Sequence, residues 1–526
     1  MAGWSIHAIR GGREHVNNAR SVVELQEAGR YLMQSATELA EYVRAQGTAG
    51  RAAHEVEKGI WKRVLQLGRW ALQQFFACAG DGDVGEEAEW PDGRRVRRLP
   101  EPHVRHYHSV FGVVSVPRAA YGSREGQRIE HVPLDARLQL PAGKFSYLLQ
   151  DWDQALAVEE SYGGVSKILG RILGFSQSVD SLERMNGNMS ASVPEFFDTL
   201  AIPAPQDEGQ LVVGSADGKG VPMRRPVEEL PIEAHRPNRG PKPNTKKMAL
   251  LGAVYSVDPV ERTPEAVVAS LFRDAKESKD PEKPDRPKPQ NKRVRASLAR
   301  DAGGTTQPAA EEIFGWMAQE IGARNPGAGK PLCVLMDGQE SLWREAERHL
   351  PGENVTQILD LLHVTPRLWK AAYLFHAEGS PAAVAFVKER VLRILRGKAR
   401  SVTRWLRWMG EYRRLPAAKK AALGKICDFF DKNAERMRYH DYLRAGYPIA
   451  TGVIEGACRH LVKDRLERAG MRWVLQGAQS MLHLRSVHLS GLWDEFTAYR
   501  IRRQTEQLYP HLPAADPQPC PLAAAA

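Results

Sequence analysis

The stretch Pro331–His363, PLCVLMDGQESLWREAERHLPGENVTQILDLLH, predicts two strands that are each followed by an aspartate. The apolar run 332–336 ends at Asp337, and the segment 354–359 ends at Asp360. Short apolar runs of this kind are typical of buried parallel strands in an α/β sheet. Ligands bind at the carboxyl ends of such strands. An aspartate at this position also suits the N-cap of a following helix, so neither residue alone establishes a function.

The same pattern occurs earlier in the chain, at Leu211–Gly220 (LVVGSADGKG), where an apolar strand is predicted to end at Asp217. A second apolar strand is expected over Lys247–Val257, and Pro308–Ile321 is expected to be a helix that leads back to the strand at 332. The Lys-, Pro- and Asp-rich segment Lys276–Lys292 predicts a surface loop. Strands interspersed with helices predict an α/β domain.

Composition narrows the class of protein. The chain has 526 residues, of which 42% are hydrophobic, so it can form several domains with real cores. Its 74 lysines and arginines exceed its 63 acidic residues, and the net charge of +11 favours a polyanionic partner such as nucleic acid.

Location follows from cysteine usage and hydropathy. The five cysteines are scattered and form no CxxC pair, which predicts neither a disulfide framework nor a zinc ribbon and favours a reducing compartment. Residues 1–50 contain no signal-peptide core, and no apolar run approaches the roughly 18 residues of a membrane span. We therefore expect a soluble, cytoplasmic protein without a membrane partner.

The first 145 residues are predicted to be mainly helical with a small β-module. Val22–Ala45 and His54–Ala77 carry apolar residues at helical spacing and predict a helical hairpin. Gly80–Pro102 has the composition of a linker. His108–Tyr121 (HSVFGVVSVPRAAY) has the β-branched and glycine pattern of a short β-hairpin.

Three helices are expected within Phe145–Met189, with a turn at Gly174 before the third. This arrangement matches a helix-turn-helix, in which Arg184 of the polar third helix would contact DNA. An ordinary three-helix bundle fits the periodicity equally well.

A long helical block is predicted over Pro381–Asn433. Its basic residues interleave with tryptophans, and Arg404, Trp405 and Arg407 are candidates for contact with the DNA backbone and with unpaired bases. The alternative is an exposed basic face whose tryptophans belong to the core.

Three carboxylates carry the candidate chemistry: Asp217, Asp337 and Glu455, the last in the first turn of a late helix. Mg²⁺ and Mn²⁺ prefer hard oxygen ligands, and two such ions can hold the attacking and leaving oxygens of a phosphodiester. Asp360 and His363 form an Asp-x-x-His pair, which we interpret as a supporting pair. Both Asp337 and Asp360 end strands, so Asp360 stays open as the second metal ligand.

Cations are expected beside these carboxylates. On the helix of Glu455, Arg459 and Lys463 follow at intervals of one turn and would lie on one face, next to DNA phosphates. Lys219 follows Asp217 closely and is also expected to contact DNA.

Together these residues resemble the DDE transposases with an RNase H-like catalytic domain, in particular the Kra-type family of bacterial insertion-sequence transposases. The resemblance covers roughly Arg105 to Trp493. It rests on HSVFGVVSVPRAAY with PLDARLQLPAGKFS, and on SADGKGVPM, KKMALLGAVYSVDPVERTPE, MDGQESLW, ILDLLHVTPRLWKAAYLFH and TGVIEGACRHLVKDRLERAGMRW.

The resemblance implies DNA cleavage and strand transfer with two Mg²⁺ or Mn²⁺ ions held by Asp217, Asp337 and Glu455. Asp360 and His363 match the Asp-x-x-His signature of related transposases. The resemblance also implies double-stranded DNA as partner, a homo-oligomer, and an α-helical insertion between Asp337 and Glu455. A transposase-derived, sequence-specific DNA-binding protein without transposition activity is the alternative, and a regulatory helical protein with a basic surface is a third hypothesis.

The expected fold is an α/β, RNase H-like mixed-sheet catalytic domain with a helical insertion, preceded by a mainly helical region. The predicted segments are an N-terminal helical region (1–85), a linker and β-module (86–145), a helix-turn-helix-like segment (146–200), the first part of the catalytic domain (201–375), the insertion (376–445), the last part with Glu455 (446–500) and a tail (501–526).

Overall fold

The computed structural model of the protein describes residues 14–89, 95–101, 103–122, 129–224, 246–272, 288–302, 305–468 and 470–510. The chain divides into two compact units. Met1–Met185 and Thr497–Ala526 form the first unit, and Asn186–Phe496 form the second. Most of the predicted loop Lys276–Lys292 and of the predicted tail lies outside the described residues.

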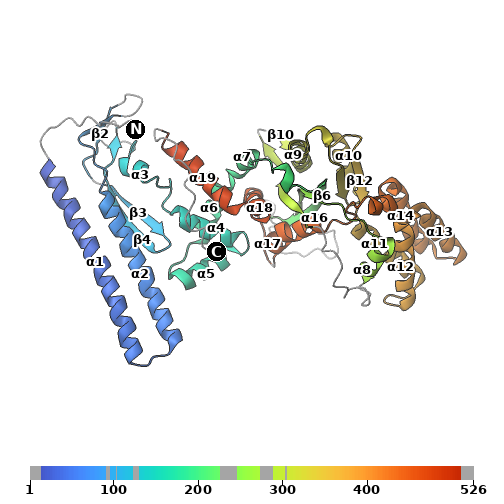
Figure 1. Ribbon diagram of the computed structural model, residues 1–526, viewed down its shortest axis with the longest axis horizontal. Helices are drawn as coiled ribbons and strands as arrows, with labels where there is room; N and C mark the ends of the chain where they lie inside the picture. Colours follow the sequence, from blue (N-terminus) through green and yellow to red (C-terminus); the bar gives the residue numbers. More distant parts are fainter. Residues whose placement is uncertain are drawn as a thin grey trace, which may run out of the picture. The chain divides into compact units, whose positions relative to one another are not determined.

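The first unit begins with the predicted helical hairpin. Helices α1 (Glu14–Thr48) and α2 (Ala53–Ala79) pack side by side (Figure 1). Tyr31 of α1 stacks on Trp70 of α2, with ring centroids 4.6 Å apart. Gly50, at a φ of +61°, lies in the turn between the helices, where a left-handed conformation favours glycine.

The predicted β-hairpin is present and is longer than expected. Strands β3 (His103–Ser109) and β4 (Gly112–Arg118) pair antiparallel, and Gly112 supplies the positive φ of +106° that the turn requires. The predicted segment, which began at His108, missed most of β3.

The linker prediction for Gly80–Pro102 is wrong in part, because this stretch contains two strands. β1 (Glu87–Glu89) and β2 (Arg95–Arg98) form a three-stranded sheet with β5 (Tyr121–Gly122). Val96 of β2 is buried, although its neighbours in the sequence are arginines, so the local pattern did not predict a strand.

Three helices follow where they were predicted: α4 (Tyr147–Ala157), α5 (Tyr162–Leu173) and α6 (Val179–Ser190). Ser146 and Ser161 cap the first two by accepting hydrogen bonds from backbone amides. Gly174 ends α5 in the left-handed conformation. The helices are confirmed, and their role as a helix-turn-helix stays a prediction.

A five-stranded mixed sheet organises the second unit, in the order β12-β11-β6-β7-β8. Its strands are β6 (Leu211–Pro222), β7 (Lys246–Val257), β8 (Gln290–Leu298), β11 (Leu332–Met336) and β12 (Val355–Leu359). β6, β7 and β8 are antiparallel neighbours, whereas β11 runs parallel to both β6 and β12. The predicted α/β class is therefore confirmed.

Helices α9 (Ala309–Arg324) and α10 (Glu340–His349) pack on one face of this sheet. Their apolar side chains form one core with alternate residues of β6, β7 and β11, among them Val212, Val254 and Met336. The close approach explains Gly252 on β7, since a Cβ there would run into Ile313 of α9.

The opposite face carries α11 (Leu361–Phe375) and a block of further helices, α12 (Pro381–Leu395), α13 (Ala399–Tyr412) and α14 (Ala417–Lys432). One continuous core joins them to the remaining residues of β6, β11 and β12. Figure 1 shows α12, α13 and α14 gathered beside α11. The helices expected over Pro381–Asn433 are thus present.

Strand β8 at the sheet edge was not predicted. Its outward backbone amides are satisfied by side chains at α18 (Leu475–Leu489): Leu298 N donates to Gln479 at 2.8 Å, and Val294 N donates to Ser490 at 3.0 Å. A last helix, α19 (Trp493–Leu508), extends into the predicted tail. None of the described helices combines the length and apolar surface needed to cross a bilayer.

Candidate active site

Asp217 lies on β6 at the point where this strand leaves its parallel neighbour. β11 pairs with β6 only as far as Gly214, and β6 continues to Pro222 paired with β7 alone. The strand therefore does not end at Asp217, as was predicted, but passes it. Side chains alternate along a strand, so Asp217 shares the face of Val213, which is the face covered by α11. Its Oδ1 accepts a hydrogen bond from Gly218 N at 2.7 Å.

Asp337 directly follows the last residue of β11, as predicted. Its Oδ1 accepts from Gln339 N at 2.8 Å, which fixes the turn into α10. The next residue is Gly338, where a Cβ would collide with the ring of Phe429 from α14. Arg367 lies against the same ring, 3.5 Å from its centroid. The helical block thus packs directly onto the turn that carries Asp337.

Asp360 is the N-cap of α11 and is fully buried. Its Oδ1 accepts from Leu362 N at 2.9 Å and from Thr451 N at 3.3 Å. Its Oδ2 accepts from the Thr451 hydroxyl and contacts His363 Nδ1 at 2.9 Å. Four polar partners occupy the carboxylate, so it joins the end of β12 to the segment that leads to Glu455.

His363 stands on the first turn of α11, with its side chain 31% exposed. Because Nδ1 is held by Asp360, Nε2 is the ring nitrogen available to other groups. The hydrogen bond to Asp360 raises the pKa of His363, and the charges of Asp360, Asp337 and Asp217 add to this rise against the opposing effect of burial.

Glu455 is exposed on the short helix α16 (Gly452–Ala457), which packs against β6 and β7. Carboxylate and imidazole atoms of Asp360, His363 and Glu455 lie within 4.8 Å of one another. After α16 the backbone turns into a π-helix over Cys458–Lys463. The uninterrupted α-helix expected there is therefore wrong, and π-helical turns are frequent at functional sites.

The pKa values of Asp217 and Glu455 respond to burial and to neighbouring charges. Burial raises the pKa of Asp217 first, and the negative charge of Asp337 raises it further, against the Cys458 and Gly218 hydrogen bonds. Burial also raises the pKa of Glu455, with added contributions from the charges of Asp360 and Asp217. Among the described residues, the ligand atoms that lie within 4.8 Å of one another at this end of the sheet are those of Asp360, His363 and Glu455, and Asp217 and Asp337 do not belong to that group.

Cys458 and Thr451 are two contributors that the sequence reading missed. The Cys458 thiol is buried and donates to Asp217 Oδ2 at 3.2 Å, so α16 and its continuation are tied to β6. Thr451 ties the same segment to Asp360. Both could have been predicted from the sequence. Cys458 lies three residues beyond Glu455, on the same helical face, and Thr451 is the N-cap residue of α16.

The predicted DNA contacts near the carboxylates are accessible. Lys219 is half-buried on β6, two residues beyond Asp217 and on the same face of the strand. Arg459 and Lys463 are exposed on the π-helix, where Arg459 lies 3.7 Å from Asp464.

The predicted contacts on α13 have different surroundings. Arg404 is exposed. Arg407 is paired with Asp428 and Asp431 of α14. Trp405 packs against the core, with the Arg390 guanidinium 4.0 Å from its ring centroid, which is the alternative considered above for the tryptophans of this block.

Arg184, the remaining predicted DNA contact, is exposed on α6 in the first unit. Its predicted role in base contact belongs to the helix-turn-helix interpretation.

Comparison with known proteins identifies no family. No family model matches the chain, and no curated protein matches it. Among solved structures, the chain has a likeness to the Drosophila P element transposase strand transfer complex, with 12% sequence identity and a TM-score of 0.22, covering 69% of this chain and 84% of that one.

Proposed function

We propose that this chain is a DDE-type transposase, which cleaves and joins DNA strands by two-metal-ion chemistry in an RNase H-like domain. The observation that supports the proposal is the placement of three carboxylates from distant parts of the chain: Asp217 on β6, Asp337 directly after the neighbouring β11, and Glu455 on α16, which packs against β6 and β7. The five-stranded mixed sheet is consistent with an RNase H-like domain.

The donor set suits Mg²⁺ or Mn²⁺. It consists of carboxylate oxygens, the ligand type that hard divalent cations prefer. Like charges close together are unfavourable unless a cation compensates them. Two bound ions would supply that compensation and would polarise a phosphodiester for attack by water or a 3′-hydroxyl. Asp217, Asp337 and Glu455 would hold them.

Asp360 fits the role of a positioning residue better than that of a second ligand. Each oxygen of its carboxylate has two polar partners within the protein, whereas no hydrogen bond to Asp337 Oδ2 is found among the described residues. Asp360 would hold Thr451 and His363 in place and so set the position of Glu455. This interpretation supports Asp337 as the metal ligand.

His363 would act on the DNA phosphate. Its raised pKa keeps the ring doubly protonated over a wider pH range, and Nδ1 is already bonded to Asp360. Nε2–H is then available to donate a hydrogen bond to a phosphate oxygen. Lys219, Arg459 and Lys463 would neutralise flanking phosphates, in keeping with the net charge of +11.

The test is strand cleavage on DNA that flanks the coding region, using the full-length chain with Mg²⁺ and a chelator control. We expect nicks at terminal inverted repeats. Asp217→Asn and Glu455→Gln should each reduce the cleavage rate by at least about 10²- to 10³-fold, the usual cost of removing one group that stabilises the transition state. The matched control is Glu347→Gln, which neutralises a surface carboxylate of α10 that contacts Arg436.

Cleavage that persists unchanged in Asp217→Asn would contradict the assignment. Specific DNA binding without cleavage by the unmodified chain would favour the DNA-binding alternative. The same assay, run with a second copy carrying an inactivating substitution, tests whether the enzyme works as a homo-oligomer.

A further inference from the structure

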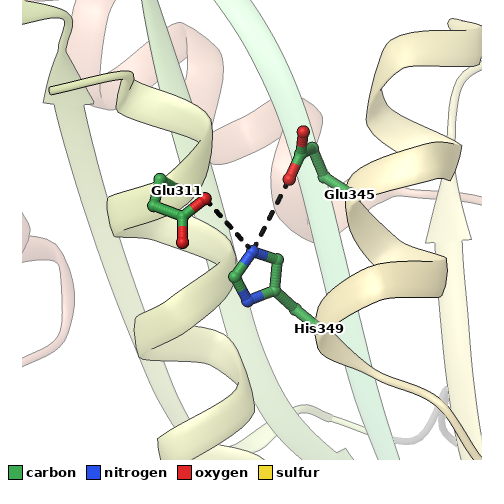
Figure 2. Close-up of side chains that lie close together, drawn as sticks. All are labelled: Glu311, Glu345 and His349. Atoms are coloured by element: carbon green, nitrogen blue, oxygen red, sulfur yellow. Dashed lines mark ion pairs between the residues drawn. The ribbon is translucent and has the colours of Figure 1, made fainter. Parts of the chain in front are cut away.

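A second group of metal-ligand side chains lies on the other face of the sheet. Glu311 projects from α9, and Glu345 and His349 project from one face of α10, four residues apart (Figure 2). One ligand atom of each lies within 4.8 Å of the others. Figure 2 shows the His349 ring between the two carboxylates. We infer that these three residues form a binding site for a transition-metal ion of the zinc class.

The distances within this site exclude ordinary hydrogen bonds. His349 Nε2 is 3.5 Å from Glu345 Oε2 and 3.7 Å from Glu311 Oε2. Both distances exceed the roughly 3.2 Å limit of a good N–H···O hydrogen bond. Nε2 and Glu345 Oε2 are both buried atoms without a hydrogen-bond partner in the described structure. His349 Nε2 and Glu345 Oε2 therefore lie 3.5 Å apart without a hydrogen bond between them.

The size of the gap suits a metal ion. Zinc binds histidine nitrogen and carboxylate oxygen at about 2.0–2.1 Å, which places neighbouring ligands of a tetrahedral site roughly 3.3–3.4 Å apart. The observed separations of 3.5 Å and 3.7 Å between His349 Nε2 and the two glutamate oxygens are a few tenths of an ångström longer. Water would complete the coordination.

The surroundings favour a borderline metal over Mg²⁺ or Ca²⁺. An imidazole ligand suits Zn²⁺, Co²⁺ or Ni²⁺, whereas hard cations require oxygen. The His349 ring is oriented by Phe314, a fully buried residue of α9 with which it stacks. Arg348 contacts Glu311 Oε2 at 2.7 Å and Glu311 Oε1 at 3.5 Å, and it lies 3.8 Å from Glu345 Oε2. Its side chain is 63% exposed, so a bound cation would have to displace it into solvent.

A metal at this position would join α9 to α10. α10 begins just after the turn of Asp337, so the ion would restrain the helix that carries that turn without contacting the catalytic cluster. This inference does not depend on the proposed function.

The test is metal binding by the full-length chain, stripped with chelator and kept in excess Mg²⁺ so that the catalytic carboxylates remain saturated. We expect one Zn²⁺ per chain by equilibrium dialysis, and a visible absorption spectrum with Co²⁺ that is typical of a low-coordinate site. His349→Ala should weaken Zn²⁺ binding at least tenfold and abolish the Co²⁺ spectrum. Glu345→Gln, nearly identical in shape, should do the same if His349→Ala is poorly folded.

Two control variants separate this site from others. Glu347→Gln lies on the same helix but contacts Arg436, and it should bind Zn²⁺ as the unmodified chain does. Asp217→Asn should also retain binding. Binding that persists in both His349→Ala and Glu345→Gln, or that is lost in Asp217→Asn, would overturn the inference. A chain that binds no Zn²⁺ would likewise overturn it.

Discussion

The substitution Asp360→Asn tests whether Asp360 positions its neighbours or binds a metal ion. The Asp360 carboxylate is fully buried and has polar contacts with Leu362 N, Thr451 N, the Thr451 hydroxyl and His363 Nδ1. In Asp360→Asn an NH₂ group replaces one oxygen, so the two partners of that oxygen lose a charged acceptor. A hydrogen bond to a charged group contributes about 1.5–3 kcal/mol, so loss of two should lower the free energy of unfolding by about 3–6 kcal/mol.

The assay is urea unfolding in the presence of chelator, so that no metal contributes to stability. The transition of the second unit should shift to lower urea in Asp360→Asn. Asp337→Asn is the comparison, because it retains the oxygen that accepts from Gln339 N, and it should change the free energy of unfolding by about 1 kcal/mol or less. Asp337→Asn should nevertheless abolish Mg²⁺-dependent cleavage.

The pH dependence provides an independent measurement. The hydrogen bond to Asp360 raises the pKa of His363 above that of the unfolded chain. The stabilising interaction with the imidazolium is therefore fully present below the unfolded pKa of about 6.5 and is lost as pH rises through the folded pKa. The stability difference between the unmodified chain and Asp360→Asn should accordingly shrink as pH rises through that range.

One result would refute this reasoning. If Asp360→Asn unfolded like the unmodified chain without metal, yet lost Mg²⁺-dependent cleavage, Asp360 would be a metal ligand and the hydrogen bonds assigned to it would contribute nothing to the fold.

Three further substitutions test other parts of the structure. Burial raises the pKa of Asp153 on α4 to about 7, and both of its carboxylate oxygens lack a hydrogen-bond partner among the described residues, so the cost of ionising it in the folded state grows between about pH 4 and 7. Asp153→Asn should therefore raise the melting temperature at pH 8 but little at pH 4, and the gain in free energy of unfolding at pH 8 has an upper bound of about 4 kcal/mol. An equal gain at both pH values would contradict this explanation. Gly338→Ala should lower the free energy of unfolding by about 1–3 kcal/mol, measured by thermal unfolding, because the added methyl group collides with the Phe429 ring. Adding Phe429→Leu should restore most of that loss, and no restoration would mean that the glycine is needed for its backbone conformation instead. Trp405→Ala should lower the free energy of unfolding by about 2–3 kcal/mol, measured with urea, because the partly buried ring packs against the core. Trp408→Ala, at a residue 55% exposed, should change it by about 0.5 kcal/mol or less, and the reverse order would contradict the placement of the two rings.

The elements that could be predicted are those whose pattern is local. The apolar run before Asp337 becomes β11, because a strand buried on both faces needs apolar residues at every position. The segment before Asp360 becomes the edge strand β12, of which the last two residues, Ile358 and Leu359, are buried. The helical block after Pro381 has the periodicity of amphipathic helices, and its helices form as expected.

The elements that were missed depend on distant partners. β8 begins among lysines and arginines and is a strand because β7 lies on one side and α18 side chains satisfy the other. β1 and β2 form with the help of β5. β6 passes Asp217 because β7 remains paired with it after β11 has ended. A sequence pattern contains no record of which partner will be available.

The chemistry divides in the same way. The sequence by itself determined which residue types are available: three carboxylates, an Asp-x-x-His pair and an excess of cations. Only the tertiary structure decided how they are used. Asp360 is buried with four polar contacts, Asp217 is tied to Cys458, and a histidine on α10 faces a glutamate on α9. The reason is physical: the charge state and ligand capacity of a side chain depend on burial and on neighbours within a few ångströms, and folding brings those neighbours from remote parts of the chain.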